Sequence, residues 1–546
     1  MSSCKQCGVN FQITTADQAF YQSWLVPSPQ LCPQCRQQSR FAWRNERSLY
    51  HSNCAVCQRS IVTIYAPEKN YLVYCSECWW GEKYDAASTG QAFDFSKTVA
   101  EQVQQLYQRM PHVALYTTNC TNSEFNNFGL NLNNCYLLFG ASNDENCLYG
   151  KFVISSIDTV DALSVFSTEL CYEAVASERC YHCRYLTNSR DCHDCLMIED
   201  CQACSDCIGC FGLHSKQYYV FNQPVSRTEY EKLKQSYSVL TTEKINELQS
   251  KFTTLKKTLP HRAGHVYASE HCTGDLILNS VNCQHCFDIK ESENCHYVYN
   301  APKAKDSQDC VFASPYGLEH CYNCCSTTGA RDTISSFMVW NSYNVGYSLE
   351  CHQSHDLLAC VGLQKKSFCI LNTAYSPADY QVLKTKIIEH MKTTGEWGEF
   401  LSPTISPFGY NETIAQEYYP LPKAAAVKLG YSWYDEPNKQ YQPQTYQVPS
   451  HITEVGDDIL QQILACQGCQ KNYKIIPQEL DFYRRLGLPI PHDCPDCRRT
   501  ERIIRRGPTQ LWSRPCSLCQ KLITTYYSAD RAAIVYCEDC YRKKMY

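Results

Sequence analysis

The sequence predicts a mixed, mainly β protein, in which a pair of small cysteine-based modules at each terminus flanks two parallel β-solenoid-like repeats joined by helices. Three observations predict this class. Eight Cys-x2-Cys pairs stand at the two ends of the 546-residue chain. Those ends match at a constant offset of 462 residues, and the middle of the chain matches itself at an offset of 150. Within that middle, cysteines recur every 12 residues.

These patterns divide the chain into six segments. They are a double module at 1–84, repeat A at 112–222, a helical connector at 223–262, repeat B at 263–372, a helix and extended connector at 373–455, and a second double module at 456–546. The 44% apolar content excludes general disorder, and the net charge of −5 excludes an overall polycation. Because no long apolar run or signal-like leader is present, we expect a cytoplasmic protein without a membrane span.

The terminal modules carry a pattern typical of zinc binding. Each Cys-x2-Cys pair places two thiolates on one tight turn, and two such turns complete a tetrahedral site for Zn2+. With four protein ligands no position stays open for water, so we predict four structural zinc ions, and iron remains the alternative metal. The predicted ligand sets are Cys4, Cys7, Cys32 and Cys35; Cys54, Cys57, Cys75 and Cys78; Cys466, Cys469, Cys494 and Cys497; and Cys516, Cys519, Cys537 and Cys540.

The first half of each module resembles a known family. Cys4-Lys-Gln-Cys-Gly-Val-Asn-Phe11, Gln18-Ala-Phe-Tyr21 and Pro29-Gln-Leu-Cys-Pro-Gln-Cys-Arg36 are similar to the family called probable zinc-ribbon domains. The resemblance implies a zinc ribbon in the first half of each module; with its second set of cysteine pairs, each end is predicted to be a double zinc ribbon. With Ser406–Thr413 and Cys360–Leu363, the whole chain also resembles large Cys-rich proteins of candidate-phyla (patescibacterial) bacteria. Both resemblances imply a fold and no particular activity.

The central repeats predict stacked strands. One column of residues 12 apart contains Cys135, Cys147, Cys171, Cys183 and Cys195, and short apolar runs alternate with Asn, Ser, Asp and Gly. Identical small residues at a short fixed period favour a parallel β-solenoid, in which each coil stacks its side chains on the coil before. A coil twice as long, made of two half-turns, remains the alternative.

The cysteines inside these repeats allow three interpretations. Core packing is the first, because cysteine is small, apolar and often buried. An iron–sulfur or additional metal site is the second, since Cys201, Cys204, Cys207 and Cys210 follow a ferredoxin-like spacing. An additional zinc site is the third, at the Cys-His mixtures Cys180-Tyr-His-Cys183 and Cys192-His-Asp-Cys195.

Each repeat is followed by a helical pattern. From Ser226 to about Leu259, apolar residues recur at helical spacing until Pro260 ends the pattern. The second pattern begins with Ser376 as the N-cap and Pro377 in the first turn, and it fades at Gly395. From there to about residue 450 we expect an extended connector.

Charge is distributed unevenly. Residues 466–546 contain 15 Lys and Arg against 8 Asp and Glu, so the middle of the chain is acidic. A helix after the second cysteine pair of that module would place arginines on one face, which is a pattern of nucleic-acid binding. Docking of this face on the acidic middle of the same chain is the alternative. The candidate nucleic-acid-binding residues are Arg498, Arg499, Arg502, Arg505 and Arg506.

No catalytic motif stands out. The sequence contains no P-loop, no His-Glu-x2-His, no Gly-x-Ser-x-Gly and no dinucleotide glycine pattern. We therefore predict a non-enzymatic zinc-binding scaffold that binds an unidentified macromolecule, either protein or nucleic acid. The alternatives are a nucleic-acid-binding protein, an iron–sulfur redox protein and a carbohydrate-active enzyme with paired carboxylates. Candidate acids for the last are Asp191, Asp194, Glu199, Asp200, Glu291 and Glu293.

Overall fold

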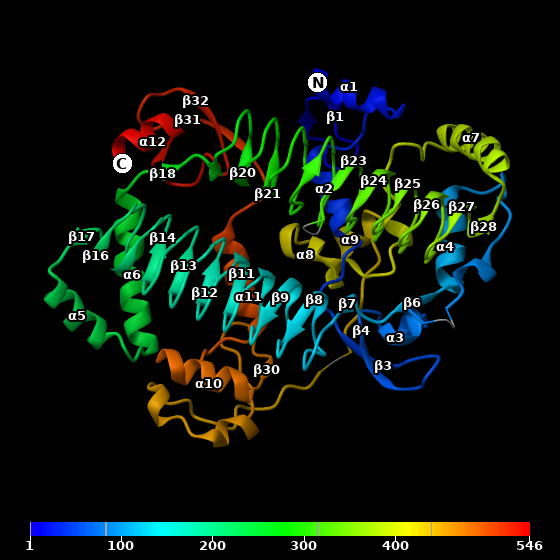
Figure 1. Cartoon of the computed structure of the whole chain (residues 1–546). Helices are drawn as coiled ribbons and strands as arrows, with labels where there is room; N and C mark the ends of the chain where they lie inside the picture. The colour runs from blue at the N-terminus through cyan, green and yellow to red at the C-terminus, as the bar shows by residue number, and fades with distance from the viewer. Residues whose placement is uncertain (1, 82–83, 314–315, 438, 546) are drawn as a thin grey trace. The chain divides into compact units, whose positions relative to one another are not determined.

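The structure, a computed structural model, describes residues 2–81, 84–313, 316–437 and 439–545 (Figure 1). The chain forms two compact units. Unit 1 comprises residues 1–115, 264–435 and 509–511, and unit 2 comprises residues 116–263, 436–508 and 512–546. Each unit therefore combines one terminal module with one central repeat, and the N-terminal module shares its unit with repeat B rather than with repeat A.

Parallel strands dominate unit 2, where they lie side by side in a row that we call ladder A (Figure 1). Each strand pairs with the next at the period of the cysteines, as Tyr172 with Arg184 and Arg184 with Leu196. The pairing thus follows the shorter of the two periods considered. The strands are β7 (Thr117–Thr118), β8 (Asn127–Asn133), β9 (Phe139–Glu145), β10 (Lys151–Ile154), β11 (Val160–Phe166), β12 (Tyr172–Val175), β13 (Arg184–Thr187), β14 (Leu196–Glu199), β15 (Ser205–Ile208), β16 (Gln217–Val220) and the antiparallel β17 (Gln223–Pro224).

Unit 1 contains the corresponding ladder B. Most of its partners keep the same period, but Ala304 pairs with Leu318, so two additional residues interrupt the period there. This insertion explains the less regular cysteine pattern of repeat B. The strands are β19 (Val266–Tyr267), β20 (Gly274–Leu278), β21 (Cys286–Lys290), β22 (Ala304–Lys305), β23 (Leu318–Tyr322), β24 (Ala330–Ile334), β25 (Tyr343–Gly346), β26 (His355–Leu358), β27 (Ser367–Ile370) and the antiparallel β28 (Thr373–Ala374).

The backbone of the ladders turns at every third residue. From Asn131 to Asn146, every third residue has a φ between 52° and 68°. Asn and Asp tolerate this left-handed conformation better than other non-glycine residues. Their side chains also hydrogen bond to the equivalent residue 12 positions on, as Asn131 Nδ2 does to Asn143 Oδ1 at 2.8 Å. The polar residues between the apolar runs therefore form the corners of the ladders.

The residues after the corners point inward and form the core of ladder A. Cys183, Cys195 and Cys207 are at most 2% exposed, and each lies in a hydrophobic cluster with residues such as Leu186 and Ile198. Their thiols donate to backbone carbonyl oxygens two residues earlier, at 3.2–3.3 Å. Small side chains with a weak donor therefore fill the core without leaving these carbonyl groups unsatisfied.

One interior position of ladder A carries a carboxyl group, at Asp144. Asp144 is 2% exposed, its Oδ1 accepts from the Ser156 N–H at 2.8 Å, and its Oδ2 is buried with no hydrogen-bond partner in the described part of the chain. Burial raises the pKa of Asp144 to about 8.

We expect the Asp144→Asn substitution to stabilise the protein at alkaline pH. Because the pKa of Asp144 is higher in the folded protein than the unfolded value of 3.8, the folded state is favoured while this carboxyl is neutral. That contribution to the free energy of unfolding is complete below pH 3.8 and is lost as the pH rises through about 8. At pH 8 the variant should gain on the order of 5 kcal/mol in the free energy of unfolding, and at pH 4 little. Denaturant unfolding of both proteins at the two pH values measures this, and an equal difference at both would contradict the buried acid.

Both ladders end in the same way. The side-chain amide of Asn222 donates to the Phe211 carbonyl oxygen and its oxygen accepts from the Phe211 N–H, both at 2.8 Å. Asn372 makes the equivalent pair with Val361. A helix follows each of these asparagine hydrogen-bond pairs, α5 (Arg227–Ser236) in unit 2 and α7 (Pro377–Thr394) in unit 1.

The two helical predictions differ in outcome. Helix α7 has Ser376 as its N-cap and Gly395 at φ 76° as its C-cap, so its bounds match the prediction. The helical stretch expected from Ser226 to about Leu259 is divided into two helices, because α5 ends at Ser236 and α6 begins at Thr242 (α6, Thr242–Thr258). Between them Leu240 is fully buried and its N–H donates to the Gly487 carbonyl oxygen at 2.8 Å. Tertiary contacts at Leu240 therefore interrupt the helical pattern.

The remaining elements belong to the modules and connectors. Across the described residues, no helix has the length and apolarity that a membrane crossing requires. Unit 1 contains β1 (Ser2–Ser3), β2 (Asn10–Phe11), α1 (Thr15–Ser23), α2 (Pro33–Phe41), β3 (Tyr50–Asn53), β4 (Ser60–Thr63), β5 (Leu72–Tyr74), α3 (Ser76–Trp79), α4 (Val99–Arg109), β6 (Pro111–Val113), α8 (Ile414–Tyr418) and α9 (Lys423–Lys428). Unit 2 contains β18 (His261–Arg262), β29 (Leu464–Ala465), β30 (Asn472–Tyr473), α10 (Pro477–Leu486), α11 (Pro495–Arg506), β31 (Trp512–Pro515), β32 (Leu522–Thr525), β33 (Val535–Tyr536) and α12 (Glu538–Met545).

Candidate metal centres and their docking helices

The first cysteine group combines a hairpin turn with the start of a helix. Cys4 and Cys7 lie between β1 and β2, Cys32 is the N-cap of α2, and Cys35 stands in its first turn. The sulfur atoms of Cys7 and Cys32 are 3.7 Å apart, and all four sulfurs lie within 4.8 Å of one another. A tetrahedral zinc site with Zn–S bonds of about 2.3 Å requires sulfurs about 3.8 Å apart. The group therefore fits a metal ion of this kind.

The second group repeats the arrangement. Cys54 and Cys57 lie between β3 and β4, Cys75 is the N-cap of α3, and Cys78 stands on that helix. The sulfurs of Cys57 and Cys75 are 3.8 Å apart. The C-terminal module builds its two groups in the same way from the hairpins β29–β30 and β31–β32 and the helices α11 and α12, with sulfur separations of 3.7 Å and 3.8 Å. The groups are Cys466, Cys469, Cys494 and Cys497, and Cys516, Cys519, Cys537 and Cys540.

Backbone N–H groups prepare these cysteines for a cation. In each group an N–H points at a sulfur, as the Cys32 N–H does at Cys4 Sγ over 3.3 Å and the Cys494 N–H at Cys466 Sγ over 3.2 Å. Burial raises the pKa of Cys516, but the N–H groups of Cys519 and Cys537 outweigh it and lower the pKa to about 6. Thiolates are the form that binds metal, so the backbone geometry at Cys516 favours ligation, whereas burial raises the pKa of Cys537 in the same group. Four sulfur ligands leave no position for substrate, and the sites suit a structural role.

The helix that carries the first metal group docks on ladder B. Arg36 and Arg40 follow Cys35 on α2, whose residues from Cys35 to Phe41 are all buried. The Arg36 Nε lies 3.0 Å and the Arg40 Nη2 2.8 Å from the two carboxylate oxygens of Asp309, and all three side chains are at most 5% exposed. Arg40 also donates to Asn323 Oδ1 at 2.9 Å. The module is thus held on the ladder by a buried ionic cluster.

Unit 2 contains the same arrangement on ladder A. Arg498 Nε lies 2.9 Å from Asp161, and Arg502 lies 2.8 Å from both Asp161 and Glu173. Arg505 also pairs with Glu173. The Arg498 guanidinium stacks over the ring of Tyr149 at 5.1 Å, as that of Arg36 does over Tyr297 at 5.2 Å. Both modules therefore use helix arginines four residues apart to recognise polar side chains on successive coils of a ladder.

These contacts determine where the candidate nucleic-acid-binding residues lie. Arg498, Arg499, Arg502 and Arg506 are at most 8% exposed, and Arg505 exposes 31% of its side chain. Because four of the five side chains are buried, they do not form an exposed basic face in this structure.

The ladder carboxylates Asp161, Glu173 and Asp309 were not predicted from the sequence as functional residues. A signal for them exists, because an offset of 148 residues brings Tyr149 and Asp161 onto Tyr297 and Asp309. The same Tyr-x11-Asp pair thus stands opposite an Arg-x3-Arg pair in each unit. Comparing the two repeats at this offset would have singled out these Tyr and Asp residues, although not their arginine partners.

The four central cysteines of repeat A lie in the interior of ladder A. Cys201, Cys204, Cys207 and Cys210 are at most 1% exposed, and each thiol donates to a backbone carbonyl oxygen at 3.2–3.4 Å. In the described ranges, the sets of potential ligands close enough to hold an ion are the four terminal cysteine groups.

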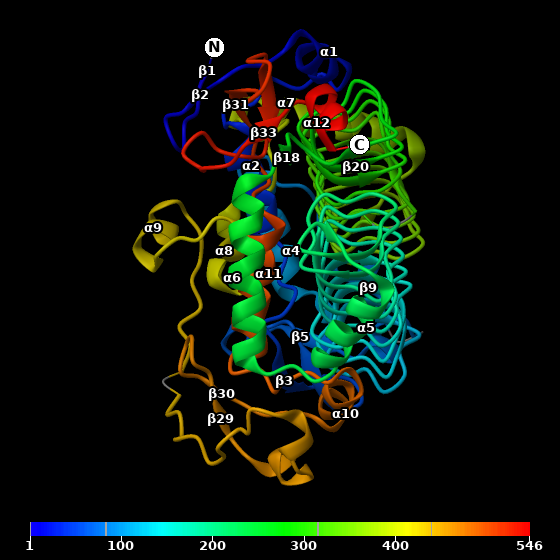
Figure 2. The same cartoon turned by 90° about the vertical axis from the view of Figure 1, so that its left-hand side faces the viewer.

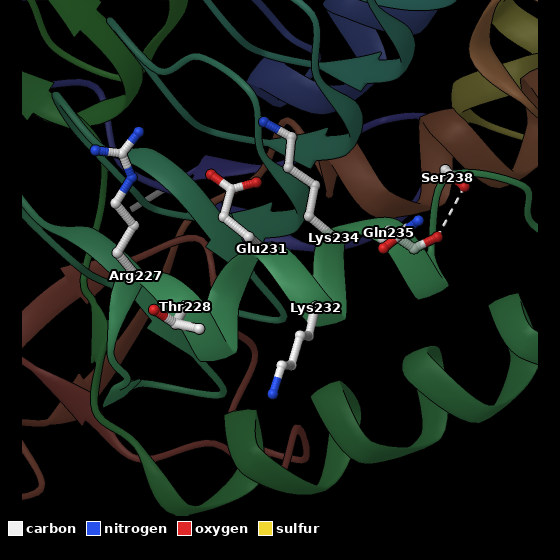
Figure 3. Close-up of a pocket in the computed structure, with 7 residues that line it drawn as sticks. All are labelled: Arg227, Thr228, Glu231, Lys232, Lys234, Gln235 and Ser238. Atoms are coloured by element: carbon white, nitrogen blue, oxygen red, sulfur yellow. Dashed lines mark hydrogen bonds between the residues drawn. The ribbon is translucent and has the colours of Figure 1, made fainter.

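A surface pocket in unit 2 lies along α5 (Figure 3). Its side chains point in different directions, with Lys232 turned away from Glu231 and Lys234. Lys234 pairs with Asp206 at 3.2 Å and Asp194 at 3.6 Å. The lining residues therefore do not converge on one point, as a catalytic pair of carboxylates would require. They are Arg227, Thr228, Glu231, Lys232, Lys234, Gln235 and Ser238.

One family model matches the chain. Residues 1–42 match the model described as a probable treble clef domain, which covers the first cysteine group and helix α2. The sequence resemblance is to a zinc-ribbon family and the matching model describes a treble clef; both are small modules in which cysteines hold zinc. A comparison with curated proteins finds no match.

Proposed function

We propose that the protein is a non-enzymatic, cytoplasmic scaffold stabilised by four zinc ions, and that its two ladders are β-solenoids presented to a macromolecular partner. Unpaired cysteines support the location, because 39 thiols without a disulfide suit a reducing compartment. Four closed Cys4 groups support zinc as the cofactor. The matching treble clef model at residues 1–42 supports the same metal.

The observation that carries this proposal is the ionic docking of each module on its ladder. Two metal ligands, Cys32 and Cys35, lie at the start of the helix that presents Arg36 and Arg40 to Asp309. A metal ion in this group would hold the start of the helix in place, and the arginines of the helix hold the module on the ladder. The metal and the charged groups thus serve the architecture and leave the remaining surface for binding.

Affinity capture from the source cells with the zinc-loaded full-length protein tests the proposal. We expect a protein partner that is retained after nuclease treatment and is lost when zinc is removed by a chelator. The matched control is the Cys324→Ser variant, which alters a buried ladder cysteine outside the metal groups and should retain the partner. Loss of the partner on nuclease treatment, with steeply salt-dependent binding of purified nucleic acid, would contradict the scaffold and favour nucleic-acid binding.

A further inference from the structure

The coils of ladder A turn at every third residue, so the ladder has several sides, of which some are covered and others exposed. The side toward α10 and α11 consists of buried residues such as Leu148, Val160 and Tyr172, which pack in one cluster with Leu480 and Phe482. Figure 2 shows α6 and α11 along one side of the ladder. One corner before this covered column, residues 145, 157, 169, 181 and 193 are exposed, and they are the part of ladder A that remains open to a partner.

The exposed side carries a column of alternating acidic and apolar residues. Glu145, Ile157, Glu169, Tyr181 and His193 stand on successive coils, and each is joined to the next by a parallel bridge. Ile157 is 42% and Tyr181 49% exposed, and both glutamates are exposed. We call this column, together with the neighbouring Phe166, the exposed ladder face.

The composition of this face differs from that of an ordinary solvated strand. Phe166 is 40% exposed and lies at the end of β11, one corner before Glu169. Glu169 separates Ile157 from Tyr181 in the column, so the face presents apolar side chains between charged ones rather than a continuous apolar patch. In this column the residues on either side of Ile157, Glu145 and Glu169, are both carboxylates. A partner with complementary charge therefore carries two cations with an apolar group between them.

The covered side shows which element can supply such cations. There, Arg498 and Arg502 stand four residues apart on α11 and meet Asp161 and Glu173, which stand one coil apart on the ladder. Four helical residues rise about 6 Å, and adjacent strands lie about 4.8 Å apart, so one helical turn spans about one coil. A helix lying along the ladder thus matches carboxylates coil by coil.

We propose that the exposed ladder face binds a helix of a partner protein that carries Arg or Lys at positions i and i+7 and an aliphatic residue at i+3 or i+4. Glu145 and Glu169 are two coils apart, about 9.6 Å, and seven helical residues rise about 10.5 Å. The aliphatic residue then covers Ile157, which lies between the two glutamates in the column. This inference rests on the proposed scaffold function and names the surface and the partner chemistry.

The test uses the zinc-loaded full-length protein and a capped, alanine-based helical peptide with Arg at i and i+7 and Leu at i+3 and i+4. Fluorescence anisotropy should show binding that weakens with rising salt. Glu169→Lys should weaken it about tenfold, the equivalent of about 1.4 kcal/mol. The matched control is Glu124→Lys, a charge reversal on an exposed residue outside this column, which should leave affinity unchanged. A second peptide with Arg at i and i+5 places the charges on different faces and should bind more weakly.

Three outcomes would overturn the proposal. The first is equal affinity for the two peptides, and the second is equal affinity of the Glu169→Lys and unaltered proteins for the first peptide. The third is self-association of the unaltered protein that Glu169→Lys abolishes, because a second copy of the chain would then occupy the face. Sedimentation velocity measures the last. The scaffold function is tested separately. If the Glu169→Lys protein keeps its zinc and still captures a protein partner, the scaffold function stands and the partner binds at another surface.

Discussion

The Asp309→Ala substitution is expected to destabilise unit 1 by about 3–5 kcal/mol, because it leaves two buried guanidinium groups without a counter-charge. Arg36 and Arg40 both pair with Asp309 and are at most 5% exposed. Neither can reach water without undocking helix α2 from ladder B. Denaturant unfolding of the full chain, followed by hydrogen exchange of α2, measures the loss and locates it.

A matched control separates the buried cluster from surface charge. Asp332 also lies on ladder B and pairs with His320, but its side chain is 38% exposed. Asp332→Ala should cost about 0–1 kcal/mol. Replacing the whole cluster, with Asp309→Leu, Arg36→Met and Arg40→Met together, should restore much of the stability. Equal losses for the two alanine variants would show that the ionic cluster does not hold the module on the ladder.

The Cys32→Ser substitution is expected to have a larger effect, on the order of 10 kcal/mol, because it opens one complete metal site. Cys32 is both a predicted ligand and the N-cap of α2, so its loss should release the first turn and the arginine cluster behind it. Hydrogen exchange should increase in α2 and in the ladder B segment around Asp309. Zinc content should fall from four ions to three.

The control for this substitution is again Cys324→Ser. Cys324 is 1% exposed and donates to the Tyr322 carbonyl oxygen at 3.3 Å, a hydrogen bond that a serine hydroxyl can replace. This variant should retain four zinc ions and native exchange in α2. If the two serine variants behave alike, the cysteine groups have no role beyond packing.

The cysteine groups could be predicted because their chemistry is local. Two thiols on a Cys-x2-Cys turn face the same point whatever surrounds them, and the 462-residue offset showed that the two ends of the chain carry the same set of turns. The short period of the cysteines likewise indicated the strand pairing, since each strand pairs with the next strand in sequence. The left-handed corners were not predicted, although the recurring Asn and Asp residues that form them were visible.

Docking of the arginine face on the acidic middle of the chain was one of the two interpretations of the sequence, but its contact residues could not be predicted, because they lie in distant parts of the chain. Asp309 lies 273 residues from Arg36, and no local pattern connects them. The same arginine spacing fits an exposed nucleic-acid surface and a buried ionic cluster equally well, and only the burial of Arg498 and Arg502 distinguishes the two. The interruption of the helix at Leu240 has the same origin, since the residue that it meets, Gly487, is far away in the sequence.

Native mass spectrometry of the intact chain, with elemental analysis of the same sample, tests the central claim most directly. Because four groups each bring four sulfurs within 4.8 Å of one another, we expect four zinc ions per chain and no iron. A chain that binds no zinc under reducing conditions, or that carries iron at these sites, would contradict the account.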